Sequence, residues 1–116
     1  MCAPYAVNLG LTLSVLAESS DASAALVVPH APVGAHTDLE AVREFASHCD
    51  VVTFDHEHVP QEILQALVAD GVEVHPKPEA LVHAQDKLVM RRRLTDLGVP
   101  CPCLLYTSPS PRDATL

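Results

Sequence analysis

The strongest constraint on this chain is an alternation of helical and extended patterns that repeats through residues 37–75. Apolar residues first recur at the spacing of one helix face, at Leu39, Val42, Phe45, Ala46 and Cys49. The apolar run Val51–Phe54 follows and is typical of a buried strand. A second helical segment, 60–71, leads to a second extended run, 72–75. Parallel strands must be joined by crossovers, so this order predicts a Rossmann-like α/β fold with a parallel sheet.

The ends of these two helices carry recognisable signals. Thr37 and Glu40 have the spacing of a capping box, which predicts that the first helix begins at Thr37. Pro60 suits the first turn of the second helix, and Gly71 suits its end. The apolar face of that helix is predicted to consist of Ile63, Leu64, Leu67 and Val68.

The regions on either side predict further elements. Residues 5–9 are expected to form the last turn of a helix that Gly10 ends, and residues 11–16 a strand, followed by a short helix or turn over 22–26. Beyond the alternating region, Pro78 is expected to open a short helix through Val82, and a longer helix should cover 86–97. No strand pattern separates those two helices, so the first domain is predicted to end near Ala84.

Composition excludes several classes of function. The formal net charge is −8, which disfavours binding to nucleic acids and anionic membranes. Apolar runs are shorter than the roughly 20 residues that cross a bilayer, and the first residues lack a secretory pattern, so we expect a cytoplasmic protein. The cysteines, at 2, 49, 101 and 103, form no Cys-x-x-Cys pair and are expected to be reduced thiols.

The segment His56-Glu57-His58 is the strongest candidate for a functional site, because its two imidazoles lie two residues apart on an extended segment and it lies just beyond the carboxyl end of the predicted strand 51–54. Ligands of open α/β sheets collect at the carboxyl ends of strands, so Glu57 is a candidate contact to a ribose or an amine. The alternative is that Glu57 and His58 cap the helix that Pro60 opens. The two histidines also have the spacing of metal ligands, with His30, His36 and His75 as further donors, but a polar loop is the favoured interpretation and no metal site is predicted.

Two other sets of charged residues are candidates for nucleotide contacts. Glu18 follows a predicted strand, where Rossmann domains hold a ribose, but no glycine-rich motif precedes it, so a surface acid is the default interpretation. Lys87 and the run Arg91–Arg93 place positive charge on the last predicted helix. That charge suits phosphate groups, although a solvated helix face is the usual explanation of such a run.

Three stretches of the sequence are distinctive when taken together: residues 15–24, beginning Val-Leu-Ala-Glu-Ser, residues 50–60, Asp-Val-Val-Thr-Phe-Asp-His-Glu-His-Val-Pro, and residues 84–100, Ala-Gln-Asp-Lys through Leu-Gly-Val-Pro. They resemble the actinobacterial branch of the 5-(carboxyamino)imidazole ribonucleotide synthase family, of the ATP-grasp superfamily. The resemblance covers roughly residues 6–102. It implies a pre-ATP-grasp domain over 1–84 and the start of an ATP-grasp region over 85–102.

The resemblance also implies a function. It implies an ATP-dependent ligase that uses Mg²⁺ to activate bicarbonate and carboxylates the amine of aminoimidazole ribonucleotide in purine biosynthesis, in a family that is typically dimeric. Lys87 matches a basic residue that contacts ATP in the family. Glu57 is similar to a strand-end acid that holds the ribonucleotide in a related transformylase. No catalytic residue is implied within this chain.

The chain also departs from the family pattern at both ends. The family begins with a strand and a glycine-rich loop that this chain does not show before Ala6. After Pro102, residues 103–116 do not match the continuation of the family and are expected to be a disordered tail that resembles translated vector sequence. We therefore expect a sheet that lacks its first strand, Mg²⁺ ligands outside the chain, and an inactive, marginally stable fragment. The alternative function is a small non-catalytic α/β module that binds a nucleotide or a partner protein.

Overall fold

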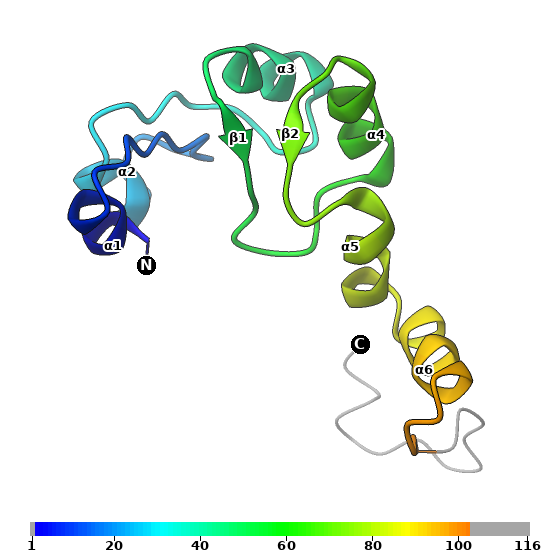
Figure 1. Cartoon of the computed structure of the whole chain (residues 1–116). Helices are drawn as coiled ribbons and strands as arrows, with labels where there is room; N and C mark the ends of the chain where they lie inside the picture. The colour runs from blue at the N-terminus through cyan, green and yellow to red at the C-terminus, as the bar shows by residue number, and fades with distance from the viewer. Residues whose placement is uncertain (1, 103–116) are drawn as a thin grey trace. The chain divides into compact units, whose positions relative to one another are not determined.

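The computed structural model describes residues 2–102, which fall into two compact units that divide after Pro78 (Figure 1). The tail predicted over 103–116 lies outside the described residues, and the domain boundary near Ala84 stays a prediction. The first unit contains α1 (Ala3–Asn8), α2 (Ser23–Val27), α3 (Leu39–Ser47), β1 (Val51–Val52), α4 (Gln61–Ala69) and β2 (Glu73–Val74). The last helices are α5 (Pro78–Gln85) and α6 (Lys87–Asp96).

The centre of the first unit is the parallel pair β1–β2, as the alternation of patterns predicts. Val51 lies opposite Glu73 and Val52 opposite Val74, and the His75 amide donates to the Val52 carbonyl at 2.9 Å. The predicted strand over 51–54 is longer than the observed one, which ends at Val52, before the bend at residues 55–57. The observed strand β1 is also buried on one side only, since Val52 is 6% exposed whereas Val51 is 54% exposed.

A second parallel pairing joins residues 14–17 to residues 30–33, but as isolated bridges and not as the continuous strand predicted over 11–16. The amide of Val15 donates to His30, the amide of Ala17 donates to Pro32, and the amide of Gly34 donates back to Ala17. A regular parallel ladder would also need an N–H at residue 32 to reach the Val15 carbonyl. Proline has no N–H, so Pro32 interrupts the ladder.

Helices α3 and α4 supply a large part of the core of this unit. The two helices contact each other, and α4 also contacts β2 (Figure 1). Leu64, Leu67 and Val74 are fully buried, and the surrounding buried side chains are Val42, Ala46, Val52, Val59 and Ile63. Val68 was predicted on the same apolar face but is 43% exposed. The aliphatic composition of the core is the one that the near absence of aromatic residues requires.

The helix ends are set by aspartates and glycines. The capping box predicted at Thr37 is wrong by one residue: Asp38 is the N-cap of α3, and its Oδ1 accepts from the amides of Glu40 and Ala41 at 3.1 and 3.4 Å. Asp86 caps α6 in the same way, through the amides of Leu88 and Val89. The glycine stops predicted at Gly10 and Gly71 are confirmed, because their φ values are 71° and 84°, and Gly98, just after α6, has a φ of 80°.

Gly34 has a different role from those helix stops. A Cβ atom at this position would lie 3.0 Å from Leu16 Cδ1 and 3.1 Å from the Ala41 Cβ. The glycine therefore allows the segment after residues 30–33 to pass close to α3. Within the described residues, no helix is long and apolar enough to cross a membrane.

The assignment of the α3 cap can be tested by substitution. We expect Asp38→Ala to lower the free energy of unfolding by about 0.5–2 kcal/mol, because it leaves two amides of the first turn without their acceptor. Thr37→Ala is the matched control and should have a much smaller effect. Urea denaturation followed by circular dichroism measures both, and a larger loss for Thr37→Ala would restore the capping-box interpretation.

Candidate functional site

Several of the charged side chains singled out from the sequence lie just after paired segments of the first unit. Glu18 follows the bridge at Ala17, His36 follows the bridge at Val33, and residues 55–58 follow β1. The paired segments are parallel, so these residues all lie on the carboxyl side of their segments. Ligands of open α/β sheets bind on this side.

Three imidazole rings form a continuous cluster in this region, which we call the histidine cluster: His36, His56 and His58. The ring centroids of His36 and His56 are 5.1 Å apart, with the planes at 79°, and those of His56 and His58 are 5.3 Å apart. The sequence singled out His56 and His58 as neighbours. It gave no signal that His36, twenty residues earlier, contacts them, because that contact depends on the tertiary fold.

A carboxylate lies beside each end of the histidine cluster. Glu18 Oε1 is 3.2 Å from His36 Nδ1, and Glu57 Oε1 is 3.8 Å from His58 Nε2. The Glu18 side chain is 72% exposed and that of Glu57 is 44% exposed, so both carboxylates are accessible to solvent. Glu18 therefore lies at the surface, as predicted, but its carboxylate is at ion-pair distance from His36 of the cluster.

The turn that carries Glu57 is closed by a short-range hydrogen bond. The His58 amide donates to Nδ1 of His56 at 3.2 Å, so the imidazole spans the residue that bears the carboxylate. The first residue before α4 is Pro60, whose side chain makes no cap. The two interpretations of Glu57, as a ribonucleotide contact and as a helix cap, both stay predictions.

The other histidines proposed as metal donors lie in separate contacts. His30 Nδ1 is 3.0 Å from the Ser14 hydroxyl, and His75 Nε2 is 2.7 Å from Glu73 Oε1. In the part of the chain that the structure describes, no group of three or more His, Cys, Asp or Glu side chains could hold a metal ion.

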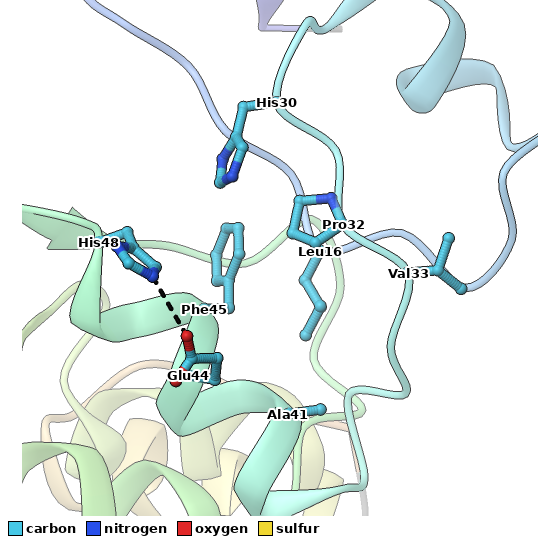
Figure 2. A pocket seen from close by; sticks show the side chains of 8 residues that line it. All are labelled: Leu16, His30, Pro32, Val33, Ala41, Glu44, Phe45 and His48. Carbon is cyan, nitrogen blue, oxygen red and sulfur yellow. Dashed lines mark hydrogen bonds and ion pairs between the residues drawn. The ribbon is translucent and has the colours of Figure 1, made fainter.

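A hollow of about 240 Å³ lies elsewhere in the first unit, between α3 and the bridged segments (Figure 2). Its polar groups are His30, Glu44 and His48; the Glu44 carboxylate is 3.3 Å from His48 Nε2, and the His30 ring stands edge-on to His48 at 6.5 Å. The remaining lining is Leu16, Pro32, Val33, Ala41 and Phe45. Neither Glu57 nor Lys87 lines this hollow, so it is separate from both predicted binding residues.

Lys87 is the first residue of α6 and is exposed to solvent. The helix start beside it is occupied by the Asp86 carboxylate, which accepts from the amides of Leu88 and Val89 at 2.9 and 3.2 Å. Arg92 and Arg93 are exposed on the same helix, and Arg91 is half-buried. The second unit therefore presents a basic helix surface.

The comparisons with known proteins identify the family. Residues 1–85 match the model of the ribonucleotide synthetase preATP-grasp domain. The chain belongs to this family. Its α/β fold with a parallel sheet, predicted from the alternation of patterns and from the resemblance, is confirmed by this match and by the structural neighbours below.

The curated relatives are considerably longer than this pre-ATP-grasp chain. It is 60% identical over 97 residues to the N5-carboxyaminoimidazole ribonucleotide synthase of Mycobacterium tuberculosis. This match covers 84% of this chain and 23% of the relative. The chain thus spans about a quarter of the length of the relatives that it matches.

Solved structures give the same relationship. The N5-carboxyaminoimidazole ribonucleotide synthetase of Thermus thermophilus superposes with a TM-score of 0.77 at 34% identity, over 86% of this chain and 27% of that one. The synthase of Aspergillus clavatus, in complex with ADP and 5-aminoimidazole ribonucleotide, superposes with a TM-score of 0.71 at 31% identity, over 84% of this chain and 26% of that one. The resemblance read from the three sequence stretches is therefore confirmed.

Glu73 has a charge environment of its own at β2. Lys77 Nζ lies 3.2 Å from Glu73 Oε1 and His75 Nε2 lies 2.7 Å from the same atom, and these two contacts, that of Lys77 first, hold the pKa of Glu73 below its usual value. A carboxyl whose pKa is lowered by folding stabilises the fold above its unfolded pKa. That contribution is lost as the pH falls through the lowered value.

We expect Lys77→Ala to move the pKa of Glu73 back up towards the usual range, because it removes the largest stabilising interaction of the carboxylate. NMR titration of the Glu73 side-chain carboxyl measures this change. Lys87→Ala removes an exposed lysine of the second unit and serves as the control. An unchanged titration of Glu73 in the Lys77 variant would contradict the assignment.

Proposed function

We propose that this chain is the ribonucleotide-side part of an ATP-dependent ligase that carboxylates aminoimidazole ribonucleotide with bicarbonate in purine biosynthesis. The observation that carries the proposal is the 60% identity over 97 residues to an N5-carboxyaminoimidazole ribonucleotide synthase. A structural neighbour, the Aspergillus clavatus synthase in complex with ADP and 5-aminoimidazole ribonucleotide, supports the same substrates. The free-standing binding module is disfavoured because the matched relatives continue well beyond this region.

In this proposal the first unit contributes to the ribonucleotide site through Glu57. The carboxylate lies after β1, on the side of the sheet where ligands of this fold class bind, and it is 44% exposed. A carboxylate is an acceptor for an amine or for ribose hydroxyls. Glu57 therefore binds and orients the ribonucleotide, whose amine attacks the activated carboxyl carbon.

The second unit contributes positive charge through Lys87 at the start of α6. An exposed ammonium group suits the phosphates of ATP. Transfer of the γ-phosphoryl group to a bicarbonate oxygen would create a mixed anhydride, and attack by the amine would release phosphate. Mg²⁺ would neutralise the phosphate charge, with its ligands in regions of the ligase that this chain does not cover.

The remaining parts of the proposal are a cytoplasmic location and a homodimer. ATP and phosphorylated ribonucleotides are cytoplasmic metabolites, which supports the location. The dimer rests on the family resemblance alone.

A chimeric enzyme tests the function directly. The matched 97 residues of the Mycobacterium tuberculosis synthase would be replaced with those of this chain. We expect ADP formation that depends on both aminoimidazole ribonucleotide and bicarbonate, measured with a coupled assay. A chimera that is well folded but shows no such ADP formation would refute the proposal.

Within this chimera, we expect Glu57→Gln to lower kcat/KM for the ribonucleotide about tenfold to a hundredfold, because a hydrogen bond to a charged group is lost. KM for ATP should change little. Glu44→Gln, on α3, is the matched control, since Glu44 also pairs with a histidine but lies on the separate hollow. An equal effect of both substitutions would argue against a ribonucleotide contact by Glu57.

We expect Lys87→Ala to raise KM for ATP about tenfold while KM for the ribonucleotide stays the same, because one charged phosphate contact is removed. Arg92→Ala, an exposed cation on the same helix, is the control for a general loss of positive charge. Initial rates at varied ATP measure both variants. If Lys87→Ala and Arg92→Ala raise KM for ATP equally, the effect comes from the overall positive charge of the helix and not from a contact between Lys87 and ATP.

A further inference from the structure

The turn that carries Glu57 is held by groups that lie far from it in the sequence. His56 accepts a hydrogen bond from the His58 amide at 3.2 Å, and its ring is in edge-on contact with His36 at a centroid distance of 5.1 Å. His36 in turn pairs with Glu18 at 3.2 Å. These contacts form a continuous path from Glu18, after one bridged segment, to the residues on both sides of Glu57.

The hydrogen bond fixes the chemical state of His56. A backbone N–H can only donate, so Nδ1 of His56 presents its lone pair and the neutral ring carries its proton on Nε2. The Nδ1 atom of His36 lies beside a carboxylate, which only accepts when it is ionised. His36 thus lies at ion-pair distance from Glu18, and this contact orients its ring towards that carboxylate.

This arrangement constrains where the Glu57 carboxylate lies. His56 and His58 are its sequence neighbours, and the bond between them closes the backbone around residue 57. Among the described residues, carboxylates lie at ion-pair distance from both ends of the histidine cluster: Glu18 next to His36, and Glu57 next to His58. The ring of His56 lies between the other two rings of the cluster.

We propose that Glu18, His36 and His56 are positioning residues that hold the Glu57 turn in its ligand-binding conformation. None of them needs to touch the ribonucleotide; His56 acts through the His58 amide, His36 packs against His56, and Glu18 orients His36. The proposal rests on the proposed function, because it assigns Glu57 as the ribonucleotide contact. It adds a role for residues that have no assigned part in binding.

The first experiment measures the turn in the 116-residue chain without any ligand. His56→Phe keeps an aromatic ring but removes the acceptor, so solvent exchange of the His58 amide, measured by NMR, should become about three- to tenfold faster. His56→Asn should restore slow exchange, because an Asn oxygen accepts from the N–H two residues later. The ¹⁵N shifts of wild-type His56 should report the proton on Nε2. Unchanged amide exchange in His56→Phe would overturn the proposal.

The second experiment uses the chimeric enzyme and separates positioning from general structural damage. His56→Phe should raise KM for aminoimidazole ribonucleotide about three- to tenfold with kcat changed less than about twofold, and His56→Asn should restore KM. Glu18→Ala should raise the same KM, whereas Glu44→Ala, which breaks a Glu–His pair at the separate hollow, should not.

The outcomes distinguish the two levels of inference. If the chimera turns over and His56→Phe leaves KM unchanged, the positioning role is overturned and the proposed function stands. If Glu18→Ala behaves as Glu44→Ala does, the part assigned to Glu18 and His36 is overturned. If the wild-type chimera shows no ribonucleotide-dependent turnover, the proposed function and the positioning role that rests on it are both overturned.

Discussion

The parallel pairing of β1 with β2 is the constraint on which the rest of the first unit depends. Two parallel strands require a crossover, and α4 provides it, burying Leu64 and Leu67 in the core that includes Val74. Parallel direction also places the residues that follow each strand on one side of the pair. The position of Glu57 after β1 is therefore a consequence of the pairing, as is that of His75 after β2.

The second parallel pairing shows how little backbone bonding is enough to position a side chain. Pro32 removes one amide from the ladder, yet the amides of Ala17 and Gly34 still bond across the two segments. Those bonds align Glu18 and His36, whose side chains meet at 3.2 Å. An exposed ion pair of this kind is worth at most about 1 kcal/mol, so the backbone bonds place the pair and not the reverse.

Glutamate–histidine pairs recur in the first unit, but they differ in range. Glu44 with His48 and Glu73 with His75 are four and two residues apart in the sequence, and such contacts follow from local geometry. Glu18 with His36 joins two bridged segments, and His36 continues the contact to His56. These long-range contacts end beside Glu57, the residue that we assign to the ribonucleotide. The Glu18–His36 pair therefore has a proposed role in binding, whereas the two local Glu–His pairs do not.

The order of elements was predictable from sequence because it depends on local signals: the spacing of apolar residues over 39–49, and the glycines at 10, 71 and 98, whose positive φ values end helices. The family was also predictable, since the segment around Glu57 is specific. Local rules failed where competing groups were adjacent, as with Asp38, which caps α3 in place of Thr37. They also failed where pairing across the chain decided the outcome, as with the strand that Pro32 interrupts. Only the tertiary structure brought Glu18 and His36 to the Glu57 turn, because contacts between residues far apart in sequence arise from strand pairing, which no local pattern encodes.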